Sequence, residues 1–193
     1  SCFQKDILNL VYLCRHFGLP EVADYWESVV ALNTWQQHRI ARLVVEKLFG
    51  TVTGKRLAIL GFAFKADTND TREAPAIRIC CDLLEEGAQL AIHDPKVAVQ
   101  QMARDLQQDA APQADALSGT GTWVEAASVE DAVTGADAVL VLTEWKHYRD
   151  LNWEALAGRM RKPAWVFDAR AVADPEQVRA AGLTLWRVGD GEG

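Results

Sequence analysis

This 193-residue sequence has only four cysteines, and no two of them form a CxxC pair. A chain of this size needs no disulfide staples, because it can bury a hydrophobic core of its own. It also lacks an apolar run near the roughly 20 residues that span a bilayer, and it lacks a basic segment leading into an apolar one at its start. We therefore expect reduced thiols in a cytoplasmic protein without a transmembrane helix.

An excess of basic residues is missing too, since 20 Lys and Arg stand against 27 Asp and Glu, for a net charge of -7. Such a chain repels phosphate-rich polymers and anionic membrane surfaces on average, so we expect neither nucleic acid nor membrane as a partner. A local pocket for one or two phosphates remains compatible with this composition. The four histidines show no metal-ligand spacing, so we expect no metal site.

Two apolar helices are expected at the start of the chain. Residues 3–17 carry apolar side chains on nearly every helical face and end before Gly18 and Pro20, so this helix should be buried on several sides. Residues 21–49 contain neither Gly nor Pro and repeat apolar residues at helical spacing, which predicts a helix roughly 40 Å long. This long helix needs a second surface against its apolar side chains, and a second copy of the chain is the simplest source of one. Residues 1–50 are thus predicted to be a helical dimerisation segment.

From residue 51 onward, short β-rich runs alternate with helical stretches. We expect strands at 56–62, 89–93, 123–126, 138–143, 164–167 and 184–188, and helices at 73–86, 97–108, 129–134, 152–160 and 175–181. The strand segments are apolar on both faces, which is typical of a parallel sheet covered on both sides. Residues 51–193 are therefore predicted to form a doubly wound, Rossmann-like α/β domain.

Ligands of an open parallel sheet bind outside the carboxyl ends of its strands. The loops expected at that edge are residues 63–72, 94–95, 143–145 and 168–170. They would bring Lys65, Arg72 and Arg170 to one edge, beside the amino end of the helix expected near Glu73. Two arginines and a lysine beside helix amides describe a diphosphate pocket.

A glycine-rich cofactor loop is not found. Gly119 and Gly121 only partly match GxGxxG, because no strand precedes them and a strand rather than a helix follows. We expect residues 112–122 to be a surface loop without a cofactor role.

Cys2 lies in the expected first turn of the first helix, with Lys5 one turn on and Asp6 on the same face. A helix dipole and a nearby ammonium both lower the pKa of a thiol, which would make the Cys2 thiolate a nucleophile. Asp6 could accept a proton from a water that attacks an intermediate bound to the sulfur. Spacing alone nevertheless favours a plainer interpretation, in which Cys2 is a small apolar residue near a helix end and Lys5 and Asp6 are solvated surface charges. The cysteines at 14, 80 and 81 are expected in the core.

Three motifs together resemble the UDP-glucose 6-dehydrogenase family: SCFQKD at 1–6, GFAFKADTNDTRE at 61–73 and FDAR at 167–170. The resemblance extends over essentially the whole chain. The first two motifs are long and jointly specific, so the resemblance reverses the plainer interpretation of Cys2.

The resemblance implies an oxidoreductase that converts the C6 alcohol of UDP-glucose to a carboxylate in two hydride transfers to two NAD molecules. Cys2 would capture the aldehyde as a thiohemiacetal, which becomes a thioester and is hydrolysed. Lys5 would stabilise the developing oxyanion, and Asp6 would position the hydrolytic water. By the same resemblance, substrate-binding residues are Phe3, Phe64, Lys65 and Arg170, and cofactor-binding residues are Lys5 and Arg72.

The family's N-terminal NAD-binding domain is absent from this sequence, and Ser1 in place of a methionine hints at a fragment. We therefore expect most of the NAD contacts to lie elsewhere and the isolated chain to have little or no NAD-reducing activity. Family members pair subunits through the long helix, which implies a homodimer or higher oligomer. Two alternatives stay open: a stand-alone nucleotide-sugar-binding or dimerisation module, and a dehydrogenase of GDP-mannose or a UDP-N-acetylhexosamine, with UDP-glucose favoured.

Overall fold

The computed structural model describes residues 2–111 and 121–191, and the Cys2 side chain lies outside the described part. Most of the loop expected at 112–122, including Gly119, lies outside it as well. No helix in the described ranges is long and apolar enough to cross a membrane.

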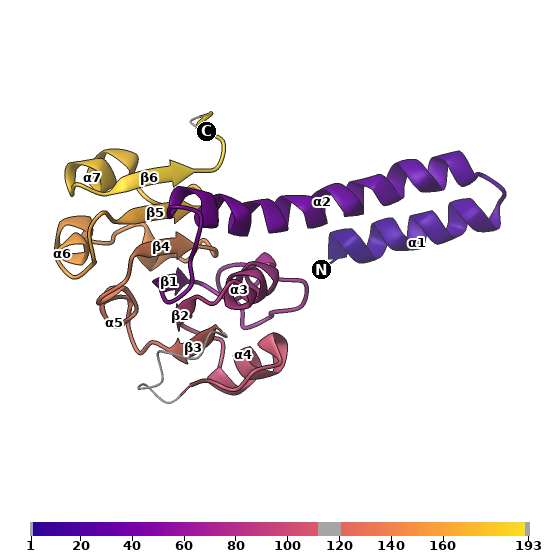
Figure 1. Ribbon diagram of the computed structural model, residues 1–193. Helices are drawn as coiled ribbons and strands as arrows, with labels where there is room; N and C mark the ends of the chain where they lie inside the picture. Colours follow the sequence, from indigo (N-terminus) through magenta and orange to yellow (C-terminus); the bar gives the residue numbers. More distant parts are fainter. Residues whose placement is uncertain (1, 112–120, 192–193) are drawn as a thin grey trace.

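Two helices, α1 (Cys2–His16) and α2 (Pro20–Lys47), form a helical hairpin that projects from the rest of the molecule (Figure 1). The turn between them uses Gly18 at a positive φ of 73°, where a side chain would be strained. Pro20 opens α2 at a position whose N–H would have no helical partner anyway. Because α1 runs antiparallel to α2, its amino end faces back toward the α/β part of the chain (Figure 1).

The remaining described chain forms a parallel sheet in the order β3-β2-β1-β4-β5-β6. Its strands are β1 (Arg56–Leu60), β2 (Gln89–His93), β3 (Thr122–Glu125), β4 (Ala138–Val141), β5 (Trp165–Asp168) and β6 (Thr184–Arg187). Its helices are α3 (Pro75–Glu85), α4 (Val99–Leu106), α5 (Val129–Val133), α6 (Trp153–Ala157) and α7 (Pro175–Ala180), with a short 3-10 helix η1 at Lys146–Tyr148. The prediction of a doubly wound α/β fold is confirmed.

Helices cover both faces of the sheet. Figure 1 shows α2, α3 and α4 on one face and α5, α6 and α7 on the other. All of β4 and residues 57–60 of β1 are buried, because each central strand packs against both helical layers. The last turns of α2 belong to this core as well, through Ile40, Ala41 and Val44. The cysteines at 14 and 80 are buried and Cys81 is half-buried, much as expected.

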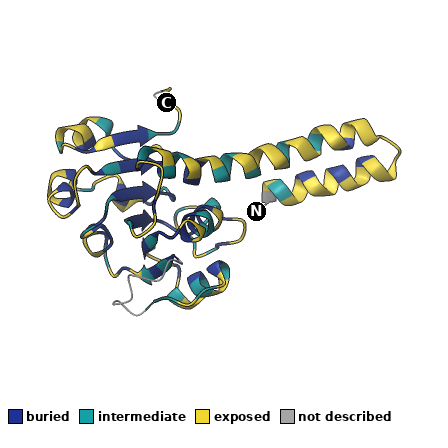
Figure 2. Cartoon of the chain, viewed as in Figure 1, coloured by how far each residue is buried: buried dark blue, intermediate teal, exposed yellow. Residues whose placement is uncertain are grey.

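The helical hairpin is far less buried than the sheet (Figure 2). Ile7, Val11 and Cys14 of α1 pack on Ala23 of α2, while aromatic side chains on the other faces stay exposed. The exposed fraction is 63% for Phe3, 65% for Tyr12 and 72% for Phe17. The expectation that this helix is buried on several sides is therefore wrong for the chain by itself. The physical reason is that, among the described residues, α1 packs mainly on α2, and one neighbouring helix can cover only one stripe of α1.

Candidate functional site

The candidate site begins where β1 ends, in the segment 61–74, which we call the β1 loop. Gly61 opens this loop with a φ of 95°, and a Cβ built on it would lie 2.4 Å from the Cβ of Thr143. No side chain fits such an approach, so glycine is required here. The buried hydroxyl of Thr143 donates a 2.7 Å hydrogen bond to the carbonyl of Ala63. The β1 loop is thus clamped to the residues that follow β4.

Arg170, two residues after β5, joins these loops through its guanidinium. Its Nε donates to the carbonyl of Leu142 at 2.8 Å, and its Nη2 donates to the carbonyl of Phe64 at 3.3 Å. Its Nη1 lies 3.4 Å from Oε2 of Glu144, whose other oxygen accepts a weak hydrogen bond from the N–H of Ala66. The structure therefore brings Phe64 and Arg170 together, at the edge of the sheet where the carboxyl ends of the strands lie.

The backbone that carries Arg170 is fixed by Asp168, the last residue of β5. This fully buried carboxylate accepts hydrogen bonds from the N–H groups of Arg170 at 3.0 Å and of Val172 and Ala173 at 2.8 Å each. Backbone amides satisfy a buried carboxylate at little conformational cost, because they are already held by the chain. The sequence motif FDAR thus encodes an anchored turn as well as a cation.

Lys65 and Arg72, the other two cations of the predicted pocket, lie in the same β1 loop. Lys65 is exposed at the surface. Arg72 forms a two-bond fork with Asp70, its Nε and Nη2 donating at 2.9 Å and 2.8 Å, and the Arg72 side chain is 80% exposed. This guanidinium lowers the pKa of the Asp70 carboxyl far below its ordinary value. The structure therefore places the Arg72 head on a neighbouring carboxylate, a contact that the sequence reasoning missed.

The helix expected at this edge begins at Pro75, two residues later than Glu73. The delay has a local cause, because Glu73 takes a left-handed φ of 57° that a helix cannot continue through. No side chain caps the first turn of α3. Its amide groups keep the electropositive character that favours an anion.

The described residues predicted on α1 lie at the surface of the helical hairpin. Lys5 and Asp6 are exposed, as is Phe3. Within residues 2–111 and 121–191, no hydrogen bond or ion pair joins these three side chains to the β1 loop. The thiol of Cys2 lies outside the described residues. The hairpin nevertheless turns the amino end of α1 toward the α/β part of the chain (Figure 1).

Two further groups at this edge were missed as site residues. Asp94, directly after β2, accepts hydrogen bonds from the N–H groups of Phe62 and Ala63 at 2.7 Å and 2.9 Å. Lys96 donates to the carbonyl of Asp67 at 3.3 Å, and its ammonium lies 5.9 Å from the ring centre of Trp145. In the sequence, only their position just after an expected strand could have indicated that they belong to the site.

A cluster of rings underlies the same edge. The Tyr148 hydroxyl donates to the carbonyl of His93 at 3.0 Å and lies 2.9 Å from the ring Nδ1 of that histidine. Burial lowers the pKa of His93, helped by the nearby His147 ring, and burial also raises the pKa of Tyr148 well above its ordinary value. Neutral rings therefore pack beneath the loops at physiological pH.

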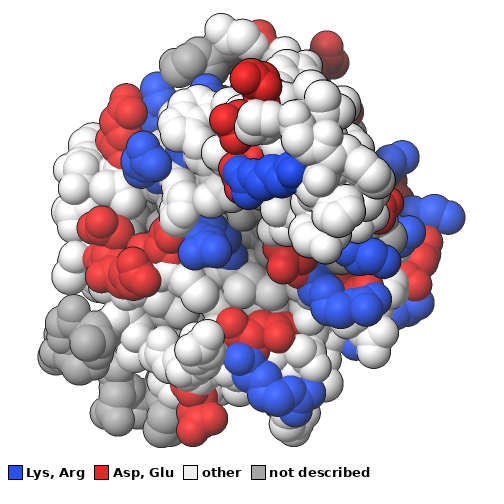
Figure 3. Space-filling model, turned by 90° about the vertical axis from the view of Figure 1, so that its right-hand side faces the viewer, with Lys and Arg blue, Asp and Glu red and all other residues white. Residues whose placement is uncertain are grey.

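Acidic and basic side chains alternate on the face toward which the hairpin points (Figure 3). Among the described residues, this face therefore carries no broad patch of one charge sign (Figure 3). A cavity of about 250 Å³ lies between α2, α3 and α4, and none of its lining residues is one of the predicted site residues. In the described part of the chain, no group of three or more His, Cys, Asp or Glu side chains could hold a metal ion.

A doubly wound parallel sheet with anchored, cation-bearing loops at its carboxyl edge is the architecture of Rossmann-like α/β domains. Residues 58–175 match the UDP-glucose/GDP-mannose dehydrogenase family, UDP binding domain, and the chain belongs to this family.

Curated relatives extend this similarity to nearly the whole chain. UDP-glucose 6-dehydrogenase 2 of Oryza sativa subsp. japonica is 44% identical over 196 residues, which cover 98% of this chain and 41% of that enzyme. UDP-glucose 6-dehydrogenase of Drosophila melanogaster is 42% identical over 189 residues, covering 98% and 40%. The chain thus spans about two fifths of the length of the curated relatives it matches.

Solved structures share the architecture. A UDP-glucose dehydrogenase from Pyrobaculum islandicum superposes with a TM-score of 0.70 at 26% identity, covering 96% of this chain and 37% of that chain. GDP-mannose dehydrogenase from Pseudomonas aeruginosa gives a TM-score of 0.62 at 18% identity, with 90% and 38% covered, and this likeness shows the fold alone.

Proposed function

We propose that this chain is the UDP-sugar-binding and cysteine-bearing part of an NAD-dependent enzyme that oxidises UDP-glucose to UDP-glucuronate. The observation that carries the proposal is the anchoring of Arg170 to the carbonyl of Phe64, within motifs shared with a family of UDP-binding domains. Identities of 42–45% to UDP-glucose 6-dehydrogenases support UDP-glucose over GDP-mannose or a UDP-N-acetylhexosamine.

Phe64, Lys65 and Arg170 form the proposed substrate contacts. A diphosphate carries negative charge on several oxygens, and a guanidinium that is already held by carbonyl groups loses little freedom when it binds one. Lys65 directly follows Phe64, is exposed, and adds a flexible point charge. Phe3 completes the proposed substrate set from the start of α1. The pocket would close when residues from outside this chain cover the open edge.

NAD would contact this chain only at its margin. The loop after β1 continues from Gly61 as Phe-Ala-Phe-Lys rather than as a glycine-rich turn, so it cannot cradle a dinucleotide pyrophosphate closely. The exposed Arg72 head fits a peripheral contact to a phosphate presented from outside, and Lys5 is the second proposed contact. When bound, NAD accepts the hydride that leaves C6 of the sugar.

The chemistry proposed for α1 follows from Cys2, Lys5 and Asp6. The Cys2 thiolate adds to the C6 aldehyde, forming a carbon–sulfur bond, and Lys5 stabilises the oxygen that becomes negative. Loss of a second hydride leaves a thioester. Asp6 orients a water that attacks the thioester carbon, so that the carboxylate forms and the thiolate leaves. Overall, one alcohol and one water yield a carboxylate, while two hydrides pass to two NAD molecules and three protons are released.

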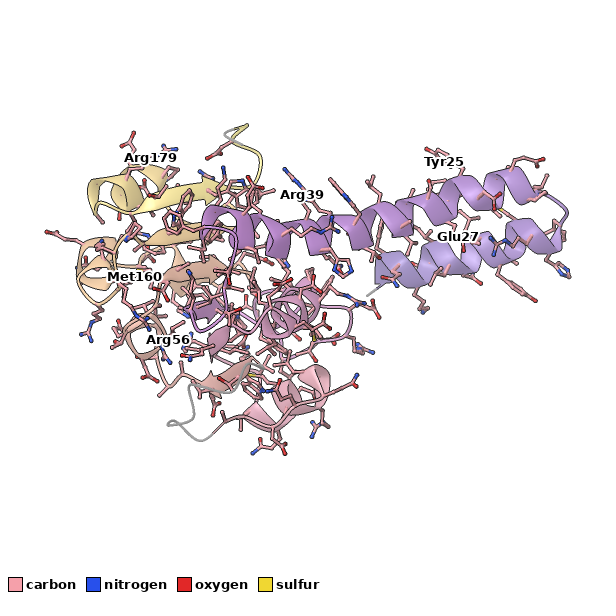
Figure 4. All side chains as sticks on the ribbon, viewed as in Figure 1. Tyr25, Glu27, Arg39, Arg56, Met160 and Arg179 are labelled. Carbon is pink, nitrogen blue, oxygen red and sulfur yellow. The ribbon has the colours of Figure 1, made fainter. Side chains whose placement is uncertain are left out.

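A second copy of this chain is the proposed partner of the helical hairpin. Exposed aromatic and aliphatic side chains run along it, namely Tyr12, Phe17, Tyr25, Leu32 and Trp35. Figure 4 shows Tyr25 and Arg39 projecting from the side of α2 that faces away from α1. Burying one such large side chain stabilises an interface by roughly 1.5–3 kcal/mol. We therefore propose residues 1–50 as a dimerisation segment and residues 51–193 as the UDP-sugar-binding domain.

The enzymatic part of the proposal is tested by joining this chain to an NAD-binding domain of a relative and recording NADH absorbance with UDP-glucose. We expect turnover by the joined protein, loss of turnover in Cys2→Ser with UDP-glucose binding retained, and little or no rate from the 193-residue chain alone. Unchanged turnover in Cys2→Ser would remove the catalytic role. A chain that binds UDP while Cys2 is irrelevant to any activity would instead be a binding module.

A further inference from the structure

Asp94 accepts five hydrogen bonds from within the described chain. Its Oδ2 accepts from the N–H groups of Phe62 and Ala63 at 2.7 Å and 2.9 Å and from the Trp145 indole at 3.2 Å. Its Oδ1 accepts from the N–H groups of Lys96 and Val97 at 2.9 Å and 3.0 Å. One carboxylate therefore joins the segments that follow β1, β2 and β4.

These bonds fix the base of the β1 loop on the side where the proposed substrate contacts begin. Phe62 and Ala63 directly precede Phe64, whose carbonyl receives the Arg170 guanidinium. The N–H of Phe64 in turn donates to the carbonyl of Asp70 at 2.8 Å, which closes the loop on itself. A shift at residues 62–63 would therefore move both Phe64 and the carbonyl that orients Arg170.

An ionised carboxylate suits this place better than a neutral amide. Every partner of Asp94 is an N–H donor, and both of its oxygens are occupied. An asparagine has one accepting oxygen and one donating NH₂ group, so its NH₂ group would oppose N–H donors in either orientation. The donors also spread the negative charge of the carboxylate, which would otherwise repel a nearby diphosphate.

We propose that Asp94 is a positioning residue of the nucleotide-sugar site, holding the β1 loop and Trp145 so that Phe64, Lys65 and Arg170 meet the diphosphate together. This inference rests on the proposed function. Asp94 acts through the backbone and need not touch the ligand itself.

The test is an NMR titration of UDP into the unaltered chain, Asp94→Asn and Asp137→Asn. Asp137 is the control, because it accepts a hydrogen bond from the N–H of Arg56 at 2.9 Å where β1 and β4 begin, at the opposite edge of the sheet from the proposed contacts. We expect Asp94→Asn to weaken UDP binding at least about tenfold, and Asp137→Asn to change it by less than about twofold. The amide signals of Phe62 and Ala63 should shift in Asp94→Asn alone.

Binding by Asp94→Asn as tight as that of the unaltered chain would overturn the positioning role and leave the proposed function intact. Failure of the unaltered chain to bind UDP would overturn the proposed function, and the positioning role with it. If Asp94→Asn does not fold, Trp145→Phe takes its place, since it removes one donor to Oδ2 and keeps a ring there. It should weaken UDP binding about threefold, and unchanged affinity would overturn the proposal.

Discussion

Gly61→Ala is expected to be the most damaging single methyl addition in the β1 loop. The new Cβ would lie 2.4 Å from Cβ of Thr143 and 2.8 Å from the backbone N–H nitrogen of that residue, which cannot move aside as a flexible side-chain end could. The φ of 95° adds conformational strain for any residue with a Cβ. Strain of this kind costs about 1–3 kcal/mol, and overpacking costs about 1–3 kcal/mol. We expect the free energy of unfolding to fall by roughly 2–6 kcal/mol.

Gly135→Ala is the matched control, because Gly135 also has a positive φ, of 70°, but a Cβ added there would meet no other atom within 4 Å. The free energy of unfolding of this variant should fall only by the cost of the left-handed backbone, roughly 1–2 kcal/mol. Urea unfolding followed by the fluorescence of the seven tryptophans measures both. Equal losses in the two variants would refute the close packing of the β1 loop against Thr143.

Three further outcomes are expected. Because burial and His147 lower the pKa of His93 below its ordinary 6.5, the unfolded chain takes up the proton first, and stability should fall as pH drops below that value. The urea midpoint measured from about pH 8 to about pH 5 should show this slope, and His93→Gln should reduce it. Trp35→Glu should shift the proposed dimer toward monomer in sedimentation, because it places a charge on an exposed apolar position of α2; an unchanged sedimentation profile would exclude Trp35 from the proposed interface. Thr143→Val should lower the unfolding free energy by about 1–3 kcal/mol in urea titration, by leaving the buried Ala63 carbonyl without its donor, and no loss would count against that bond.

The fold was largely predictable because the strands bury both faces. Residues 89–93, expected as a strand from their apolar run, are β2. Helix ends were less predictable. The helix α3 begins only after Glu73, whose left-handed backbone conformation is not indicated by any local sequence pattern. The short helix η1 was missed because a single 3-10 turn carries no periodicity.

The candidate site was predictable in its location and only partly in its contacts. Strand topology alone put Lys65 and Arg170 on one edge of the sheet. The pairing of Arg72 with Asp70 and the anchoring role of Asp94 depend on side-chain geometry that sequence spacing does not encode. The catalytic role proposed for Cys2 rests on motif resemblance, since its spacing to Lys5 is common in ordinary surface helices.

The exposed hairpin marks another limit of sequence reasoning. An apolar pattern on nearly every face predicts burial, but it does not say whether the covering surface belongs to the same chain. In the described part of the chain Phe17 and Tyr12 stay exposed because α1 packs mainly on α2. The pattern therefore reports a surface that another polypeptide can cover.

Calorimetric titration of UDP-glucose into the unaltered chain and into Arg170→Ala tests the central claim most directly. We expect saturable binding by the unaltered chain and a loss of affinity of at least about tenfold in Arg170→Ala, because the guanidinium that the carbonyl groups of Phe64 and Leu142 hold in place is gone. Equal affinity of the two proteins would contradict it.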